Sequence, residues 1–192
     1  SSVVDQSLIY KIAYLGGNFD DYTVNFSRGA SMIVMQYYNF LRFGRSGYKS
    51  IMDNCVNNAD WFIQKLTENK TLSKYLKNIS NFDTEGKKQK VRLPVIALTW
   101  QDVDSKPSWD LTDLSDKLAQ HGWVVPAYKT PKYSPEDTYG IQVLRIVVQQ
   151  VVTRDKLNML LQNMIEAVEH LEENNIQTTT KKHVARYTSG LC

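Results

Sequence analysis

The most constraining feature of the sequence is a regular apolar repeat that begins at Tyr48. Apolar residues recur at spacings of three and four, at Tyr48, Ile51, Met52, Cys55, Ala59, Phe62, Ile63 and Leu66. That spacing places their side chains on one side of an α-helix. The pattern therefore predicts an amphipathic helix over residues 48–66.

The segment before this helix is unusually rich in aromatic residues. Residues 25–48 read NFSRGASMIVMQYYNFLRFGRSGY. We expect a helix from about Ala30 that is interrupted around Gly44 and Gly47. Such a crowded helix is either buried on most of its circumference or fitted around something large, and a large apolar patch usually marks an interface.

Short β-branched and aromatic runs predict strands. Residues 7–15 and 22–26 predict two strands joined by the turn GGNFDD, and further strands are expected at 93–100, 123–128 and 141–148. Pro126 places the strand at 123–128 at an edge or a bend. An isolated hairpin is marginally stable in water. We therefore expect the two N-terminal strands to end a larger domain that begins upstream of Ser1.

Helix signals separate the later strands. A short helix is expected to carry Leu72, Tyr75, Leu76 and Ile79, before a polar loop at 81–90. Asp110 is a predicted N-cap for a helix that ends at Gly122, and Thr153 is a predicted N-cap for the last helix. From residue 48 onward, helices and strands alternate in a way that predicts a small sheet covered by helices, an α+β arrangement.

Composition and spacing exclude several classes of function. The net charge of +3 is small and dispersed, unlike the dense basic surface of a nucleic-acid-binding protein. The three histidines are isolated in the sequence, which does not favour a metal site. Two cysteines without disulfide spacing indicate a reducing compartment. No apolar run approaches the ~20 residues of a membrane span, so we expect a cytoplasmic protein with no membrane partner.

Two residues are candidates for a functional site. Arg145 lies in VLRIVV, which is apolar on both faces of a strand, and a buried guanidinium needs a carboxylate or phosphate partner. The alternative is an edge strand from which Arg145 reaches water. Ser27 lies between a strand and a helix, where its hydroxyl can cap the helix or meet an anion.

Five motifs in register resemble the C-terminal part of glutamate decarboxylase. They are YLGG from Tyr14, NFSR from Asn25, QYYNFLRFGRSGY from Gln36, GWVVPAY from Gly122 and LRIVV from Leu144. The likeness runs from about Leu8 to Asp155 and is greatest to the plant, fungal and bacterial branch. It implies a group II decarboxylase that uses pyridoxal phosphate.

The resemblance implies a fold class, α/β with an α+β C-terminal domain. This is the C-terminal part of a pyridoxal-phosphate-dependent transferase-like fold, of the aspartate aminotransferase type. Residues 1–44 would end the large cofactor domain and start the connecting helix, 45–175 would form the small domain, and 176–192 would be a polar, flexible tail. The aromatic helix would pack on the large domain and on the partner of a homo-oligomer, at least a dimer.

The resemblance also implies roles for both candidate residues. Ser27 would reach the cofactor phosphate of the neighbouring subunit, and Arg145 would bind a carboxylate of the substrate glutamate. No catalytic residue is expected in this chain, because the family's Ser-x-His-Lys motif, with its Schiff-base lysine, does not occur in it.

Three alternatives remain open. The chain could be a non-catalytic interaction module derived from the small domain, or part of a related decarboxylase with another substrate. Plant relatives can carry a calmodulin-binding extension, but TTTKKHVARY has no tryptophan and no clear apolar face. The sequence therefore does not favour calmodulin as a partner.

Overall fold

The computed structural model describes residues 10–14, 17–21, 29–80, 93–102, 106–130 and 140–173. The chain divides into two compact units. One comprises Ser1–Ser50 with Thr180–Cys192, and the other comprises Ile51–Thr179.

The first unit contains an antiparallel hairpin of β1 (Tyr10–Tyr14) and β2 (Gly17–Asp21). The expected turn GGNFDD is wrong, because GNFDD is itself the second strand. The register pairs Tyr14 with Gly17, so the chain after Gly17 continues alongside β1. Pairing overrides the low strand propensity of asparagine and aspartate. The strand expected at 22–26 lies outside the described residues.

Helix α1 (Ser31–Glu68) contains the predicted interruption. The interruption is a kink at Gly44, where φ is 55° and ψ is −171°, a conformation that only glycine adopts freely. The rings of Phe40 and Phe43 contact Tyr48 across the kink, with centroids 5.9 and 5.6 Å apart. Gly47, which was expected to interrupt the helix as well, lies within it.

The second unit is built on a four-stranded antiparallel sheet in the order β3-β4-β6-β5. Its strands are β3 (Leu76–Asn78), β4 (Val95–Trp100), β5 (Ala127–Lys129) and β6 (Gln142–Val147). Its remaining helices are α2 (Lys70–Tyr75), α3 (Leu111–Gln120) and α4 (Arg154–Glu173). The edge position predicted from Pro126 is confirmed, since β5 ends the sheet.

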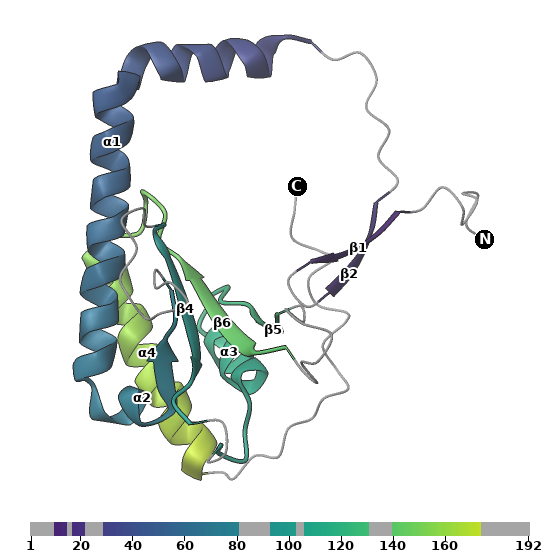
Figure 1. Ribbon diagram of the computed structural model, residues 1–192, viewed down its shortest axis with the longest axis vertical. Coiled ribbons are helices and arrows are strands. Elements are labelled where there is room, and N and C mark those ends of the chain that lie inside the picture. Colours follow the sequence, from purple (N-terminus) through teal and green to yellow (C-terminus); the bar gives the residue numbers. More distant parts are fainter. Residues whose placement is uncertain are drawn as a thin grey trace. The chain divides into compact units, whose positions relative to one another are not determined.

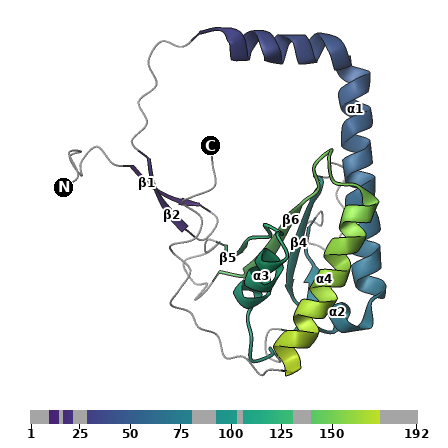
Figure 2. The ribbon, with the colours of Figure 1, turned by 180° about the vertical axis from the view of Figure 1, so that it is seen from behind.

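The core lies between the helices and one face of this sheet. Both ribbon views place α3 and α4 on that face (Figure 1, Figure 2). The C-terminal part of α1 supplies Phe62 and Leu66, the sheet supplies Leu98 and Leu144, and α4 supplies Met164, all buried. This is the predicted α+β layer arrangement.

The predicted helix ends are confirmed. Asp110 and Asp113 form a reciprocal capping box at the start of α3. Gly122, with φ of 82°, follows the end of α3. Thr153 Oγ1 accepts a hydrogen bond from the Lys156 backbone N–H at 3.3 Å, at the start of α4.

The short helix expected around residues 72–79 is only partly correct. Helix α2 ends at Tyr75, and Leu76 begins strand β3 opposite Trp100 of β4. Leu76 keeps its place in the core from the strand. Sheet pairing therefore takes over where the apolar spacing still fits a helix.

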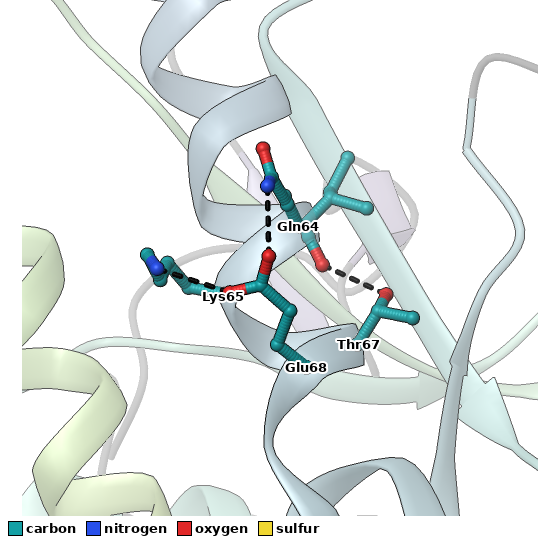
Figure 3. A network of polar contacts seen from close by, with 5 residues as sticks. Gln64, Lys65, Thr67 and Glu68 are labelled. Atoms are coloured by element: carbon teal, nitrogen blue, oxygen red, sulfur yellow. Dashed lines mark hydrogen bonds and ion pairs between the residues drawn. The ribbon is translucent and has the colours of Figure 1, made fainter.

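A polar network closes the last turn of α1 (Figure 3). Gln64 Nε2 donates to Glu68 Oε1 at 2.7 Å, and Lys65 Nζ lies 3.0 Å from Glu68 Oε2. Thr67 Oγ1 donates to the Ile63 backbone oxygen at 2.8 Å. The Gln64 bond, followed by Lys65, lowers the pKa of the Glu68 carboxyl. These partners offset the unfavourable position of an acidic residue at a helix C-terminus.

Candidate functional site

Arg145 lies in an interior strand. Arg145 pairs with Ala97 of β4. Its backbone N–H donates to the backbone oxygen of Pro126 at 3.0 Å, and Pro126 directly precedes β5. The edge-strand alternative for Arg145 is therefore wrong. Strand β6 lies inside the sheet, between β4 and β5.

Strand alternation separates Arg145 from the helix-covered core. Leu144 and Ile146, on either side of it, belong to the core. Successive side chains of a strand point to opposite faces, so Arg145 and Val143 belong to the other face. Ala97 lies opposite Arg145 on that face.

The guanidinium of Arg145 has a buried N–H group that lacks an acceptor among the described residues. Its Nε is buried and has no hydrogen-bond partner within the described segments, and its Cζ lies 5.9 Å from the centre of the Tyr128 ring. A buried N–H without an acceptor costs about 1–3 kcal/mol. A carboxylate would remove that cost, because a guanidinium can donate two parallel hydrogen bonds to it.

Tyr128 is a neighbour of Arg145 that the sequence alone does not single out. It pairs with Val143 in the β5–β6 register, which puts it on the same face as Arg145. The sequence indicated only that an aromatic residue, the last of GWVVPAY, follows Pro126 by two positions. Only the strand order shows that this aromatic residue lies next to the arginine.

The other candidate residue, Ser27, lies outside the described residues. In the described part of the chain, no group of three or more His, Cys, Asp or Glu side chains could hold a metal ion. None of the helices in these segments has the length and apolar character that a membrane crossing requires.

A separate cavity of about 370 Å³ lies where the end of α1 meets β3. Its lining consists of Ile63, Thr67, Ser73, Leu76, Lys77, Asn78 and Gln101. Arg145 and Tyr128 do not contribute to it, so the arginine site is separate from this cavity.

The known proteins most similar to this chain include glutamate decarboxylases from plants and bacteria. The chain is 31% identical to glutamate decarboxylase 5 of Arabidopsis thaliana over 167 residues, which are 87% of this chain and 30% of that protein. It is 32% identical to glutamate decarboxylase alpha of Listeria monocytogenes over 179 residues, 93% of this chain and 33% of that protein. No family model matches the chain.

A solved structure supports the same relationship. Glutamate decarboxylase of Lactobacillus brevis superposes with a TM-score of 0.62 and 30% sequence identity, over 88% of this chain and 35% of that one. This match confirms the predicted fold class, the C-terminal part of an aspartate aminotransferase-type fold. The chain spans about a third of the length of the relatives it matches, and over most of its own length it is similar to glutamate decarboxylases of plants and bacteria.

Proposed function

We propose that the chain forms part of a glutamate decarboxylase, which converts L-glutamate to 4-aminobutanoate and carbon dioxide with pyridoxal phosphate. The observation that carries this proposal is the buried Nε of Arg145, which has no hydrogen-bond partner among the described residues, in a chain similar to glutamate decarboxylases. The rest of the polypeptide would supply the lysine that binds the cofactor. These residues by themselves would be inactive.

Arg145 would bind a substrate carboxylate, in this proposal the one that leaves as carbon dioxide. Its two-pronged geometry would fix the plane of that carboxylate. Orientation of the bond to be broken determines which bond the cofactor activates. An arginine held on a rigid interior strand suits this task better than one on a loop.

The cofactor would supply an electron sink for the negative charge left on the substrate carbon. The donor set of the described residues fits the substrate side of such a site, because Arg145 has an unused N–H. Ser27 would donate its hydroxyl to the cofactor phosphate of the neighbouring subunit. That role rests on the resemblance of NFSR to the family motif.

The exposed N-terminal part of α1 supports a homo-oligomer of at least two subunits. Its apolar residues are between 54% and 73% exposed: Met32, Ile33, Val34, Met35, Tyr37, Tyr38, Phe40 and Leu41. Burial of such a surface is strongly favourable. Residues 1–44 would end the large domain and 45–175 would form the small domain. Residues 176–192 lie outside the described residues, and we propose that they do not bind calmodulin. We place the enzyme in the cytoplasm.

The test uses the native gene product that contains these residues. Its mass shows whether the chain continues upstream, and its activity is measured as carbon dioxide released from glutamate with pyridoxal phosphate. Arg145→Lys keeps the positive charge but loses the two-pronged geometry of the guanidinium. The value of kcat/KM should therefore fall about 10- to 100-fold, the equivalent of ~1.5–3 kcal/mol. The melting temperature should stay unchanged.

Arg154→Lys is the matched control. Arg154 also lies over an aromatic ring, with its Cζ 5.7 Å from the centre of Trp61, but it lies at the start of α4. Its replacement should leave kcat/KM unchanged. A lowered melting temperature with normal kinetics for Arg145→Lys would overturn the carboxylate role. Release of carbon dioxide from another amino acid only, or no release at all, would favour a different decarboxylase or an interaction module.

A further inference from the structure

Strand β5 is held in a defined register beside Arg145. The Arg145 N–H donates to the Pro126 oxygen at 3.0 Å, and the Thr130 N–H donates to the Ile141 oxygen at 2.9 Å. Thr130 Oγ1 also accepts from the Ile141 N–H at 3.0 Å. These bonds lie on both sides of Tyr128 and prevent β5 from sliding along β6.

This register brings an aromatic ring to the arginine. Tyr128 lies opposite Val143, which is two residues before Arg145 on the same face of β6. The distance of 5.9 Å from Arg145 Cζ to the Tyr128 ring centre is within the range of a cation–π interaction. The aromatic ring attracts the guanidinium without occupying any of its N–H donors.

We propose that Tyr128 is a positioning residue, which holds the Arg145 guanidinium through its ring so that the N–H donors remain available for a substrate carboxylate. The proposal rests on the carboxylate-binding function proposed for Arg145. It explains how Nε can be buried and still have no hydrogen-bond partner in the described residues. An acidic residue in place of Tyr128 could also hold Arg145. Its carboxylate would, however, accept hydrogen bonds from the guanidinium and leave fewer N–H donors for the substrate.

The test measures binding of glutarate, an unreactive dicarboxylate, to the whole cofactor-loaded protein by titration calorimetry. Tyr128→Leu should weaken glutarate binding about 3- to 30-fold, the range expected for the loss of a partly desolvated cation–π contact. Tyr128→Phe keeps the ring and should bind glutarate like the wild type. Weakening in Tyr128→Phe equal to that in Tyr128→Leu would overturn the proposal, because the hydroxyl and not the ring would then be responsible.

A second measurement covers the case in which Tyr128→Leu does not fold. Phenylalanines with increasing numbers of fluorine atoms at position 128 keep the shape of the ring and progressively remove its negative face. Glutarate affinity should decrease with each added fluorine while the melting temperature stays constant. Constant affinity across the series would overturn the proposal.

A double-mutant cycle separates this inference from the function on which it rests. Arg145→Met removes the charge, and once it is present Tyr128→Leu should weaken glutarate binding no further. An undiminished effect of Tyr128→Leu in that background would overturn the positioning role. If Arg145→Met weakens binding and Tyr128→Leu does not, only the inference fails. If Arg145→Met has no effect, the proposed function of Arg145 fails as well.

Discussion

The indole N–H of Trp109 donates to Glu172 Oε1 at 2.7 Å, which joins the segment before α3 to the last turn of α4. Trp109 is buried, and its ring contacts Trp100 and Tyr75 with centroids 5.2 and 5.6 Å apart. The hydrogen bond therefore satisfies the one polar atom of a side chain that is otherwise packed in the core.

Glu172→Ala should lower the free energy of unfolding by about 1 kcal/mol, because it leaves the indole N–H without its acceptor. Glu172→Gln keeps an acceptor and should have a smaller effect. Urea denaturation followed by tryptophan fluorescence measures both. The adjacent exposed Glu173 provides the control, and Glu173→Ala should change stability by less than about 0.5 kcal/mol. Equal losses for Glu172→Ala and Glu173→Ala would contradict the role assigned to this bond.

Asn58 connects α1 to the segment that leads into α4. Its Nδ2 donates to the Val152 backbone oxygen at 3.3 Å, and its Oδ1 accepts from Arg154 Nε at 3.3 Å. Asn58 is buried, whereas the neighbouring Asn57 is exposed. The side chain thus satisfies two polar groups at the place where the two helices meet.

Asn58→Ala should destabilise the protein by about 1–3 kcal/mol, because the Val152 carbonyl and the Arg154 guanidinium lose a partner. Asn57→Ala is the matched control and should be neutral or slightly stabilising, since alanine has the higher helix propensity. Chemical denaturation of both variants measures the difference. If the two midpoints coincide, the Asn58 contacts contribute nothing to stability.

The long helices could be predicted from the sequence because their apolar spacing is unambiguous. Residues 48–66 and the segment after Thr153 form helices as expected. The short strands β2 and β3 could not, since GNFDD and LKN have no strand pattern of their own. Their conformation comes from pairing with β1 and β4, and pairing partners are not encoded in a local window.

The same limit applies to the candidate site. Arg145 could be singled out because a guanidinium in an apolar strand needs a partner. Tyr128 could not, because its position beside Arg145 depends on the strand order β4-β6-β5. Asn58 shows an intermediate case. It falls on the apolar stripe of α1, three residues after Cys55, where a polar residue indicates a buried hydrogen bond.

The network at the end of α1 should make stability depend on pH in the acid range. The Gln64 hydrogen bond, followed by Lys65, holds the pKa of Glu68 below its ordinary value. A carboxyl with a lowered pKa stabilises the fold fully above its pKa in the unfolded chain. That contribution is lost as the pH falls through the pKa of the folded state.

Gln64→Ala should therefore lower the melting temperature at pH 7, and the difference from wild type should shrink between about pH 5 and pH 2. Differential scanning calorimetry at both ends of this range measures the effect. In a Glu68→Gln background, Gln64→Ala should show the same difference at every pH. A pH-independent difference in the presence of Glu68 would contradict the assignment.

Gly140 lies just before β6, next to the bonds between Thr130 and Ile141 that hold Tyr128 beside Arg145. A Cβ on this residue would lie 1.7 Å from the Thr130 backbone oxygen and 2.8 Å from its carbonyl carbon. Both atoms belong to the backbone, so a side chain at position 140 can be accommodated only if the two strands move apart. The contacts between Thr130 and Ile141 would then be lost.

Gly140→Ala should destabilise the protein by about 1–3 kcal/mol, the usual cost of overpacking, and should also weaken glutarate binding because Tyr128 moves with β5. Gly29→Ala is the stability control, since a Cβ there meets none of the described residues within 4 Å. Thermal melting and calorimetric titration of the whole protein measure the two effects. Lost stability with unchanged glutarate affinity would show that the register of β5 does not affect Arg145. Unchanged stability would show that the close approach of Gly140 to Thr130 relaxes without cost.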